Sequence, residues 1–225
     1  MQVRGPNIVK TDLAFHIDAA NHISYNQSAT WKDISKNVHV LTLQNNPTFS
    51  TENAGILTFN GTNNYTGTSA PEITVSPNNV WTVCGWIKPL YQPNRVINPQ
   101  STGAIQSISY DSTEAIKITI CDAAGSNIRN RLSTPNSVPS NSWTYFCISI
   151  NNLEIKMYMN GVLNSTYNES IAISGWDGWW WLFTNNVQTV FYSGSVSNIS
   201  CYNKILTNSE ILHNYNVLKS RFVLN

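Results

Sequence analysis

A cluster of aromatic rings is the strongest candidate for binding chemistry in this sequence. The segment ISGWDGWWWLF, at residues 173–183, places four tryptophans within six residues. Side chains alternate between the two faces of a strand, so Trp179 and Trp181 are expected on one face and Trp180 on the other. Flat aromatic rings pack against the C–H faces of sugars, and Asn or Asp side chains hydrogen-bond the hydroxyls. The candidate contacts to a carbohydrate or a protein partner are Trp176, Asp177 and Trp180.

The same rings have a structural alternative. Tryptophan is enriched in buried contacts and in subunit interfaces, so these side chains could fill the core or a contact between copies. Trp176 stands between Gly175 and Asp177, which is typical of a loop tip. The sequence alone does not decide whether these tryptophans fill the core or an interface, or form a platform that binds glycans.

The acidic and histidine residues do not form a catalytic pattern. Retaining glycoside hydrolysis needs two carboxyl groups about 5 Å apart. The closest acidic pair, Asp111 and Glu114, falls in a Ser/Thr-rich turn, where solvated side chains are expected. His16 lies in an apolar strand and is interpreted as a structural histidine. The four histidines, which belong to no Ser/His/Asp or metal-binding pattern, are His16, His22, His39 and His213. The sequence therefore predicts a protein that is not an enzyme and has no catalytic residues.

No cofactor and no metal site are predicted, with calcium as the remaining candidate. A calcium site needs several oxygen ligands that converge at about 2.3–2.6 Å. The available carboxylates are far apart in the sequence: Asp18, Asp33, Asp122 and Asp177.

The cysteines also lack metal-binding spacing. No C-x-x-C pair occurs, and each cysteine sits in a run typical of a strand, so four small buried hydrophobic residues are expected. A disulfide would require two strands to place a pair side by side, and a reducing cytosol would keep the thiols free. The residues are Cys84, Cys121, Cys147 and Cys201.

The composition excludes several partners. Charged residues are 11% of the 225, and the formal net charge is +1, which disfavours nucleic acid because phosphate binding needs clustered Lys and Arg. No apolar run approaches the roughly 20 residues that cross a bilayer, so no membrane insertion is expected. The opening MQVRGPNIVKTDLAFHID has no pattern of a secretory signal. With 41% hydrophobic residues, the chain has enough apolar material for a core.

The elements that must position these residues are mostly strands. From Trp143 to about Tyr167, apolar and polar side chains alternate with period two, and the turns Asn151-Asn152 and Asn160-Gly161 suit tight hairpins. This segment predicts a three-stranded antiparallel meander. The other predicted strands are Leu13–Asp18, Val38–Leu43, Gly55–Asn60, Trp81–Lys88, Ala104–Ser109, Ala115–Cys121, Trp180–Thr184 and Thr189–Tyr202.

Short strands at this spacing predict an all-β sandwich or barrel. Pro89, Pro93 and Pro99 predict a long irregular surface connection after the strand that starts at Trp81. No linker or repeat divides the chain, so a single domain over residues 1–225 is expected.

One helix is predicted near the C-terminus. Thr207 and Glu210 have the spacing of a capping box, in which each side chain binds the other residue's backbone N–H. Ile211, Leu212, Tyr215 and Leu218 then recur at helical spacing. The helix is expected to pack against the sandwich and close it.

Several motifs, in this order, resemble the laminin-G-like, concanavalin A-like lectin/glucanase superfamily. They are FNGTNNY at 59–65, WTVCGWIKP at 81–89, MYMNG at 157–161 and SGSVSNISCYNKILTNSEILHNYNVLKSRF at 193–222. The opening GPNIVKTDLAFHIDAANHISY, TWKDIS at 30–35 and the NYNVLKSRF ending resemble the versions of this domain in tailed-bacteriophage virion proteins.

The resemblance implies a two-sheet antiparallel jelly-roll sandwich with one short C-terminal helix. It implies a non-enzymatic virion surface protein, made in the host cytoplasm without a signal peptide, that serves as a capsid decoration, cement or fibre-associated subunit. The implied partners are other virion proteins of the capsid or fibre, host-surface glycans and further copies of the chain in a homo-oligomer. The alternative is a carbohydrate-binding lectin or adhesin module not tied to a capsid. Glycosidases of the superfamily carry alternate carboxylates on one strand in an ExDxE-type motif, which this sequence lacks.

Overall fold

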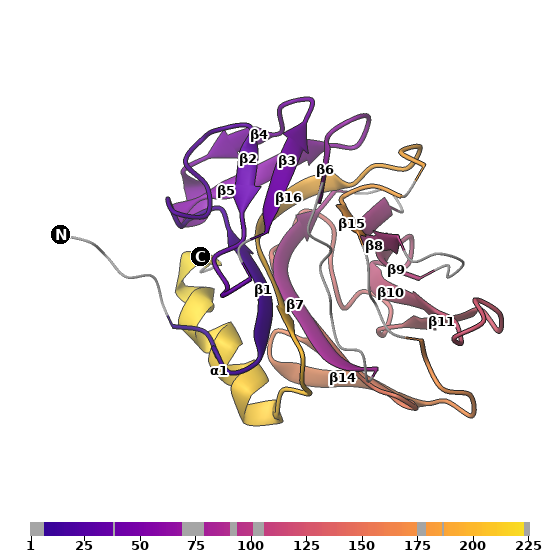
Figure 1. The fold of residues 1–225 in the computed structure, drawn as a ribbon. Helices are drawn as coiled ribbons and strands as arrows, with labels where there is room; N and C mark the ends of the chain where they lie inside the picture. The colour runs from indigo at the N-terminus through magenta and orange to yellow at the C-terminus, as the bar shows by residue number, and fades with distance from the viewer. Residues whose placement is uncertain are drawn as a thin grey trace.

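Two antiparallel sheets pack face to face, and a helix lies against the outside of one of them (Figure 1). The computed structural model describes residues 7–37, 39–68, 79–90, 94–100, 106–174, 179–185 and 187–222. This arrangement confirms the predicted fold class, a nearly all-β sandwich with one short C-terminal helix. None of the helices in the described ranges has the length and apolar character needed to cross a bilayer.

Sheet A has eight strands, and its long central strands curve around the core. In spatial order they are β14 (Val162–Asn168), β13 (Glu154–Met159), β12 (Thr144–Asn151), β7 (Val80–Pro89), β16 (Ser193–Tyr202), β5 (Ile56–Asn60) and β4 (Thr48–Ser50). The eighth, β1 (Leu13–Asp18), pairs with the second half of β16, while β5 pairs with its first half. The predicted meander is confirmed as β12, β13 and β14. Asn160 and Gly161 both have positive φ, as a tight hairpin turn requires.

Sheet B also has eight strands and holds the tryptophan-rich segment. In spatial order they are β11 (Arg129–Leu132), β10 (Ala115–Ile120), β9 (Ser107–Asp111), β8 (Asn94–Gln100), β15 (Trp179–Leu182), β6 (Tyr65–Thr68), β3 (Val40–Gln44) and β2 (Thr30–Lys32). A short 3-10 helix, η1 (Glu52–Ala54), lies between β4 and β5.

The predicted loop bounded by prolines is partly wrong. Residues 94–100 form β8, a strand with β9 on one side and β15 on the other. Pro99 lies near the end of β8, beyond Ile97, the last residue of β8 that pairs with β9. The short strands β2, β4, β6 and β11 were also not predicted, because three or four residues carry too little periodicity.

Strand β12 is buried on both faces. Phe146, Ile148 and Ile150 pack in the core between the sheets, whereas Tyr145 and Cys147 pack in a second apolar cluster beneath the helix. This explains a strand in which nearly every residue is apolar or buried. The helix therefore forms a third layer on the outer face of sheet A and does not close an open end of the sandwich.

Cys84 on β7 and Cys147 on β12 stand directly opposite each other in this second cluster. All four cysteines are buried free thiols, as predicted. The strands thus bring one pair side by side without a disulfide between them.

Helix α1 (Asn208–Lys219) begins at the predicted cap. The Thr207 hydroxyl accepts from the backbone N–H of Glu210 at 3.2 Å, and the Glu210 carboxylate accepts from the backbone N–H of Thr207 at 2.9 Å. Ile211 and Leu218 are buried against sheet A, but Leu212 is 44% exposed, which corrects its predicted place in the packing face. A 3-10 turn, η2 (Ser220–Phe222), follows and buries Phe222.

Thr207→Ala is expected to lower the free energy of unfolding by about 1 kcal/mol, because the backbone N–H of Glu210 loses the hydroxyl that caps it. Urea denaturation measures the change. Thr207→Ser keeps the hydroxyl and should retain most of the stability. Equal losses in both variants would show that the methyl group, and not the cap, is responsible.

Candidate functional site

The tryptophan-rich segment enters the middle of sheet B. Strand β15 pairs with β8 on one side and β6 on the other, so the predicted strand is confirmed. The backbone of Trp180 lies opposite Pro99, and that of Trp181 lies opposite Asn98. Trp176 and Asp177 lie outside the described residues. The segment ends in the core, where Leu182 and Phe183 are fully buried.

Next to β15, the face of sheet B that points away from the core carries hydroxyl and amide groups. Asn98, Ser107, Ser109 and Thr119 alternate along their strands with core residues such as Ile108. All four side chains are at most 9% exposed, so these polar groups are buried. The Ser109 hydroxyl has no hydrogen-bond partner among the described residues. Neutral donors and acceptors therefore flank the strand that carries the tryptophans.

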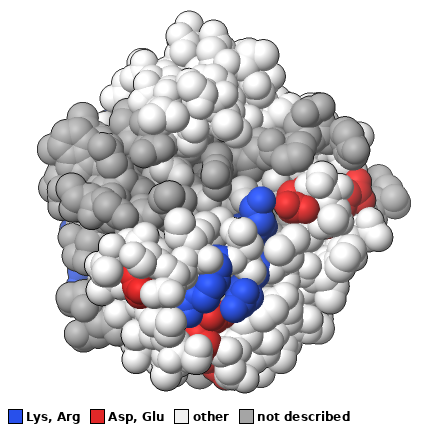
Figure 2. All heavy atoms as spheres, turned by 90° about the vertical axis from the view of Figure 1, so that its right-hand side faces the viewer, with Lys and Arg blue, Asp and Glu red and all other residues white. Residues whose placement is uncertain are grey.

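Charged side chains are few on this side of the molecule, and several of them form ion pairs. Figure 2 shows basic and acidic side chains next to one another on a largely uncharged surface. Arg131 contacts Glu169 at 2.6 Å, and Arg129 contacts the second oxygen of the same carboxylate at 2.9 Å. Lys117 and Asp111 form a looser pair at 3.3 Å. The uncharged surface suits a neutral polar ligand better than a polyanion.

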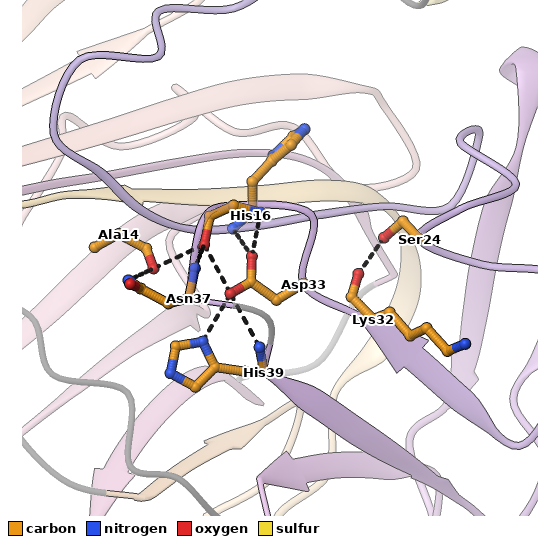
Figure 3. Close-up of polar contacts among 8 residues, drawn as sticks. Ala14, His16, Ser24, Lys32, Asp33, Asn37 and His39 are labelled. Atoms are coloured by element: carbon orange, nitrogen blue, oxygen red, sulfur yellow. Dashed lines mark hydrogen bonds and ion pairs between the residues drawn. The ribbon is translucent and has the colours of Figure 1, made fainter.

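A buried carboxylate organises the N-terminal part of the sandwich (Figure 3). One oxygen of Asp33 accepts from the backbone N–H groups of His16 at 2.9 Å and Ser35 at 2.7 Å. The other accepts from the Ser35 hydroxyl at 2.8 Å and the His39 N–H at 3.3 Å, and lies 2.7 Å from Nδ1 of His39. Burial alone would raise the pKa of Asp33, but these hydrogen bonds hold it below its ordinary value. Both oxygens are occupied, so the carboxylate anchors β1 to the turn before β3.

His16, predicted to be structural, is buried on β1 with its Nδ1 2.8 Å from the Ser200 hydroxyl. Burial lowers the pKa of His16, although nearby carboxylates partly oppose this effect. The neutral ring therefore belongs to the packing between β1 and β16.

The proposed calcium donors do not come together in the described part of the chain. Asp18 binds the Arg221 guanidinium through two contacts of 2.9 Å, and Asp122 accepts from the N–H groups of Ala124 and Ser126 within its own turn. Asp177 lies outside the described residues. No three His, Cys, Asp or Glu side chains gather into a metal-binding cluster within the ranges that the structure describes.

The closest acidic pair is part of a turn, as expected. Asp111 accepts from the N–H and hydroxyl of Thr113, and Glu114 accepts from the backbone N–H of Ser140. Each carboxylate holds a loop, and the geometry offers no shared site for a substrate.

A second candidate, which the sequence did not indicate, is a pocket of about 350 Å³ beneath the end of α1. Trp86, Trp143, Tyr215 and Phe222 line it together with polar side chains. Trp86 stacks on Phe222 with ring centroids 4.2 Å apart, and Trp143 packs on the same ring at 4.7 Å. These residues come from segments far apart in the sequence, so no local motif marks the pocket.

The family comparison agrees with this architecture. The family described as "Concanavalin A-like lectin/glucanases superfamily" matches residues 60–212, which is more than half of the chain. The chain therefore belongs to this superfamily and has a lectin-like fold. No curated protein sequence matches the chain.

Similar solved structures include several toxin binding domains. The receptor binding domain of botulinum neurotoxin D has a TM-score of 0.71 and 12% identity, with 91% of this chain and 52% of that chain covered. The binding domain of Paraclostridial Mosquitocidal Protein 1 has a TM-score of 0.70 and 19% identity, with the same coverage. The botulinum neurotoxin serotype D ligand binding domain in complex with N-acetylneuraminic acid has a TM-score of 0.72 and 12% identity, covering 91% and 50%.

At these identities the likeness shows the shared fold alone. The chain also spans only about half the length of each of these solved structures.

Proposed function

We propose that this chain is a non-enzymatic carbohydrate-binding module displayed on a virion surface, as a capsid decoration, cement or fibre-associated subunit. One observation carries the glycan part of this proposal. The tryptophan-rich strand β15 occupies the middle of sheet B in a lectin-like sandwich, and the neighbouring strands carry buried neutral hydroxyl and amide groups. Trp176, Asp177 and Trp180 are the proposed contacts, and host-surface glycans are the proposed ligands.

The virion role rests on the two ends of the chain, which resemble tailed-phage versions of the domain. These ends form one structural unit outside sheet A. The His213 ring binds the backbone carbonyl of Asn7 at 2.9 Å, and Asn214 accepts from the backbone N–H of Val9 at 2.8 Å. The two segments that carry the resemblance are therefore in direct contact. Attachment to capsid or fibre proteins, as a homo-oligomer, belongs to the same proposal.

A lectin or adhesin without a capsid is the second candidate. The structural neighbours that are toxin binding domains favour it, since one of them holds N-acetylneuraminic acid. Mass spectrometry of purified virions distinguishes the candidates, because only the first requires the chain in the particle.

The described tryptophans give the glycan proposal a sharp test. Trp31, Trp81, Trp86 and Trp143 are at most 7% exposed, so acrylamide quenching of the free protein reports mainly on the other four tryptophans. Appreciable quenching that decreases on glycan binding is expected. Negligible quenching in the free protein would mean that all eight rings are shielded, and the platform at β15 would be abandoned.

Trp176→Ala is expected to weaken glycan or partner binding on an array while leaving the melting temperature nearly unchanged, because a loop-tip ring contributes little to the core. Val187→Ala, at a 64% exposed loop position after the same strand, is the control and should change neither quantity. A large fall in melting temperature for Trp176→Ala would place that ring in the core.

The purified protein is expected not to hydrolyse β-glucans, alginate or other common polysaccharides, since the sequence lacks the ExDxE-type carboxylate motif. Reducing-end assays measure this. Turnover that survives repurification and disappears when one carboxylate is replaced would overturn the non-enzymatic assignment.

A further inference from the structure

The pocket beneath the end of α1 has walls suited to a flat apolar surface. Besides its contacts with Trp143 and Phe222, Trp86 lies nearly parallel to Tyr215, with ring centroids 5.6 Å apart and an interplanar angle of 19°. The helix supplies Tyr215 and sheet A supplies Trp86, so the rings are held by two packed layers. The volume of about 350 Å³ is at the small end of the range for ligand pockets, about 300–1,000 Å³, and suits a single ring.

The polar groups of this pocket are mainly hydrogen-bond donors. The indole N–H of Trp86, a side chain only 3% exposed, has no partner among the described residues. This nitrogen is itself buried, so it forms part of the rigid wall and is not a donor that a ligand in the pocket reaches. The side-chain carbonyl oxygen of Asn160 accepts from the backbone N–H of Tyr145 at 3.0 Å. This leaves the N–H₂ group of the same side chain to act as a donor.

The charge of the pocket is positive. Lys219 lines it, with its ammonium 5.5 Å from the centre of the Tyr215 ring, and no carboxylate side chain is among the described lining residues. The C-terminal end of a helix carries a partial negative charge of about half an elementary charge, which the full charge of the ammonium exceeds. The pocket therefore favours a ligand that is rich in acceptors and negatively charged.

We propose that this pocket binds a sugar ring that carries a carboxylate. The C–H face of the sugar packs on the aromatic walls, one of its oxygens accepts from the Asn160 amide, and its carboxylate pairs with Lys219. The site goes beyond the proposed glycan platform because it lies on the outer side of sheet A, whereas β15 belongs to sheet B (Figure 1). The two sites would let one copy of the chain contact two glycan groups.

Amide and indole NMR spectra of the full chain, titrated with sodium glucuronate or with glucose, test this proposal. Glucuronate is expected to shift the indole signal of Trp86 and the amide signals of residues 215–220, and to bind several-fold more tightly than glucose. Lys219→Gln should weaken glucuronate binding about threefold to tenfold, because a partly screened ion pair is lost.

Lys36→Gln, at an exposed lysine remote in the sequence, is the matched control and should bind glucuronate like the parent protein. Equal binding of glucose and glucuronate, an unchanged affinity in Lys219→Gln, or shifts confined to other residues would each overturn the proposal. Trp176→Ala separates the two sites: it should weaken binding at β15 but leave the glucuronate titration unchanged. The experiments can therefore disprove ligand binding at one site without disproving it at the other.

Discussion

Phe183→Ala is expected to lower the free energy of unfolding by about 3–5 kcal/mol, the range found when a buried Phe is truncated. Phe183 ends the tryptophan-rich segment and is fully buried between the sheets. The centroid of its ring lies 4.1 Å from the ring centroid of Phe59 and 5.7 Å from that of Tyr192. The alanine variant would leave a cavity that rigid strands from both sheets cannot collapse.

Phe191→Ala is the matched control for this measurement by urea denaturation. The Phe191 ring is only half-buried and packs against Tyr65 at the edge of the same region. A clearly smaller loss is expected there. If both variants lost the same stability, the burial of Phe183 would not be what anchors the end of β15.

The second large effect concerns Asp33. Asp33→Asn is expected to lower the free energy of unfolding by about 2–4 kcal/mol, because an amide N–H₂ group would face donors that now bind a carboxylate oxygen. The Ser35 and His39 N–H groups illustrate the conflict, since each points at a different oxygen of the same side chain. Asp12→Asn, at an exposed position with positive φ that asparagine tolerates, is the control and should cost little.

The same carboxylate predicts the pH dependence of stability. Since the pKa of Asp33 is lower in the folded protein than its ordinary value of 3.8, the unfolded chain takes up the proton first as the pH falls. The stabilisation is therefore present above about pH 4 and lost as the pH falls through the folded pKa. Unfolding measured across acidic pH should show this loss in the parent protein and much less of it in Asp33→Asn.

His16 adds a second pH-dependent contribution to the free energy of unfolding, at higher pH. Its pKa in the folded protein is below the ordinary value of 6.5, because burial disfavours the charged ring. The contribution is present above pH 6.5 and decreases as the pH falls below that value, since the unfolded chain binds the proton more readily. His16→Asn should flatten the stability profile in this interval, and an unchanged slope would exclude His16 as its source.

The candidate sites show where sequence reasoning succeeds and where it stops. The aromatic cluster at 173–183 was visible because four rings are close in the chain, and a strand was confirmed for its part Trp179–Leu182. The pocket beneath α1 was missed because Trp86, Trp143 and Tyr215 meet only after β7, β12 and the helix have packed. Asp33 was identified only as a candidate calcium donor, since nothing in TWKDIS reveals that His39 and the backbone of His16 converge on it.

Local interactions account for what the sequence by itself determined. The meander from Thr144 to Asn168 follows from period-two alternation and an Asn-Gly turn, and α1 follows from a capping box, all of which operate within a few residues. Only the tertiary structure decided that β8 is a strand despite Pro99, and that the helix covers the outer face of sheet A. Those outcomes depend on partners distant in the chain, such as β15 for β8 and Trp86 for the helix, whose contacts no local pattern encodes.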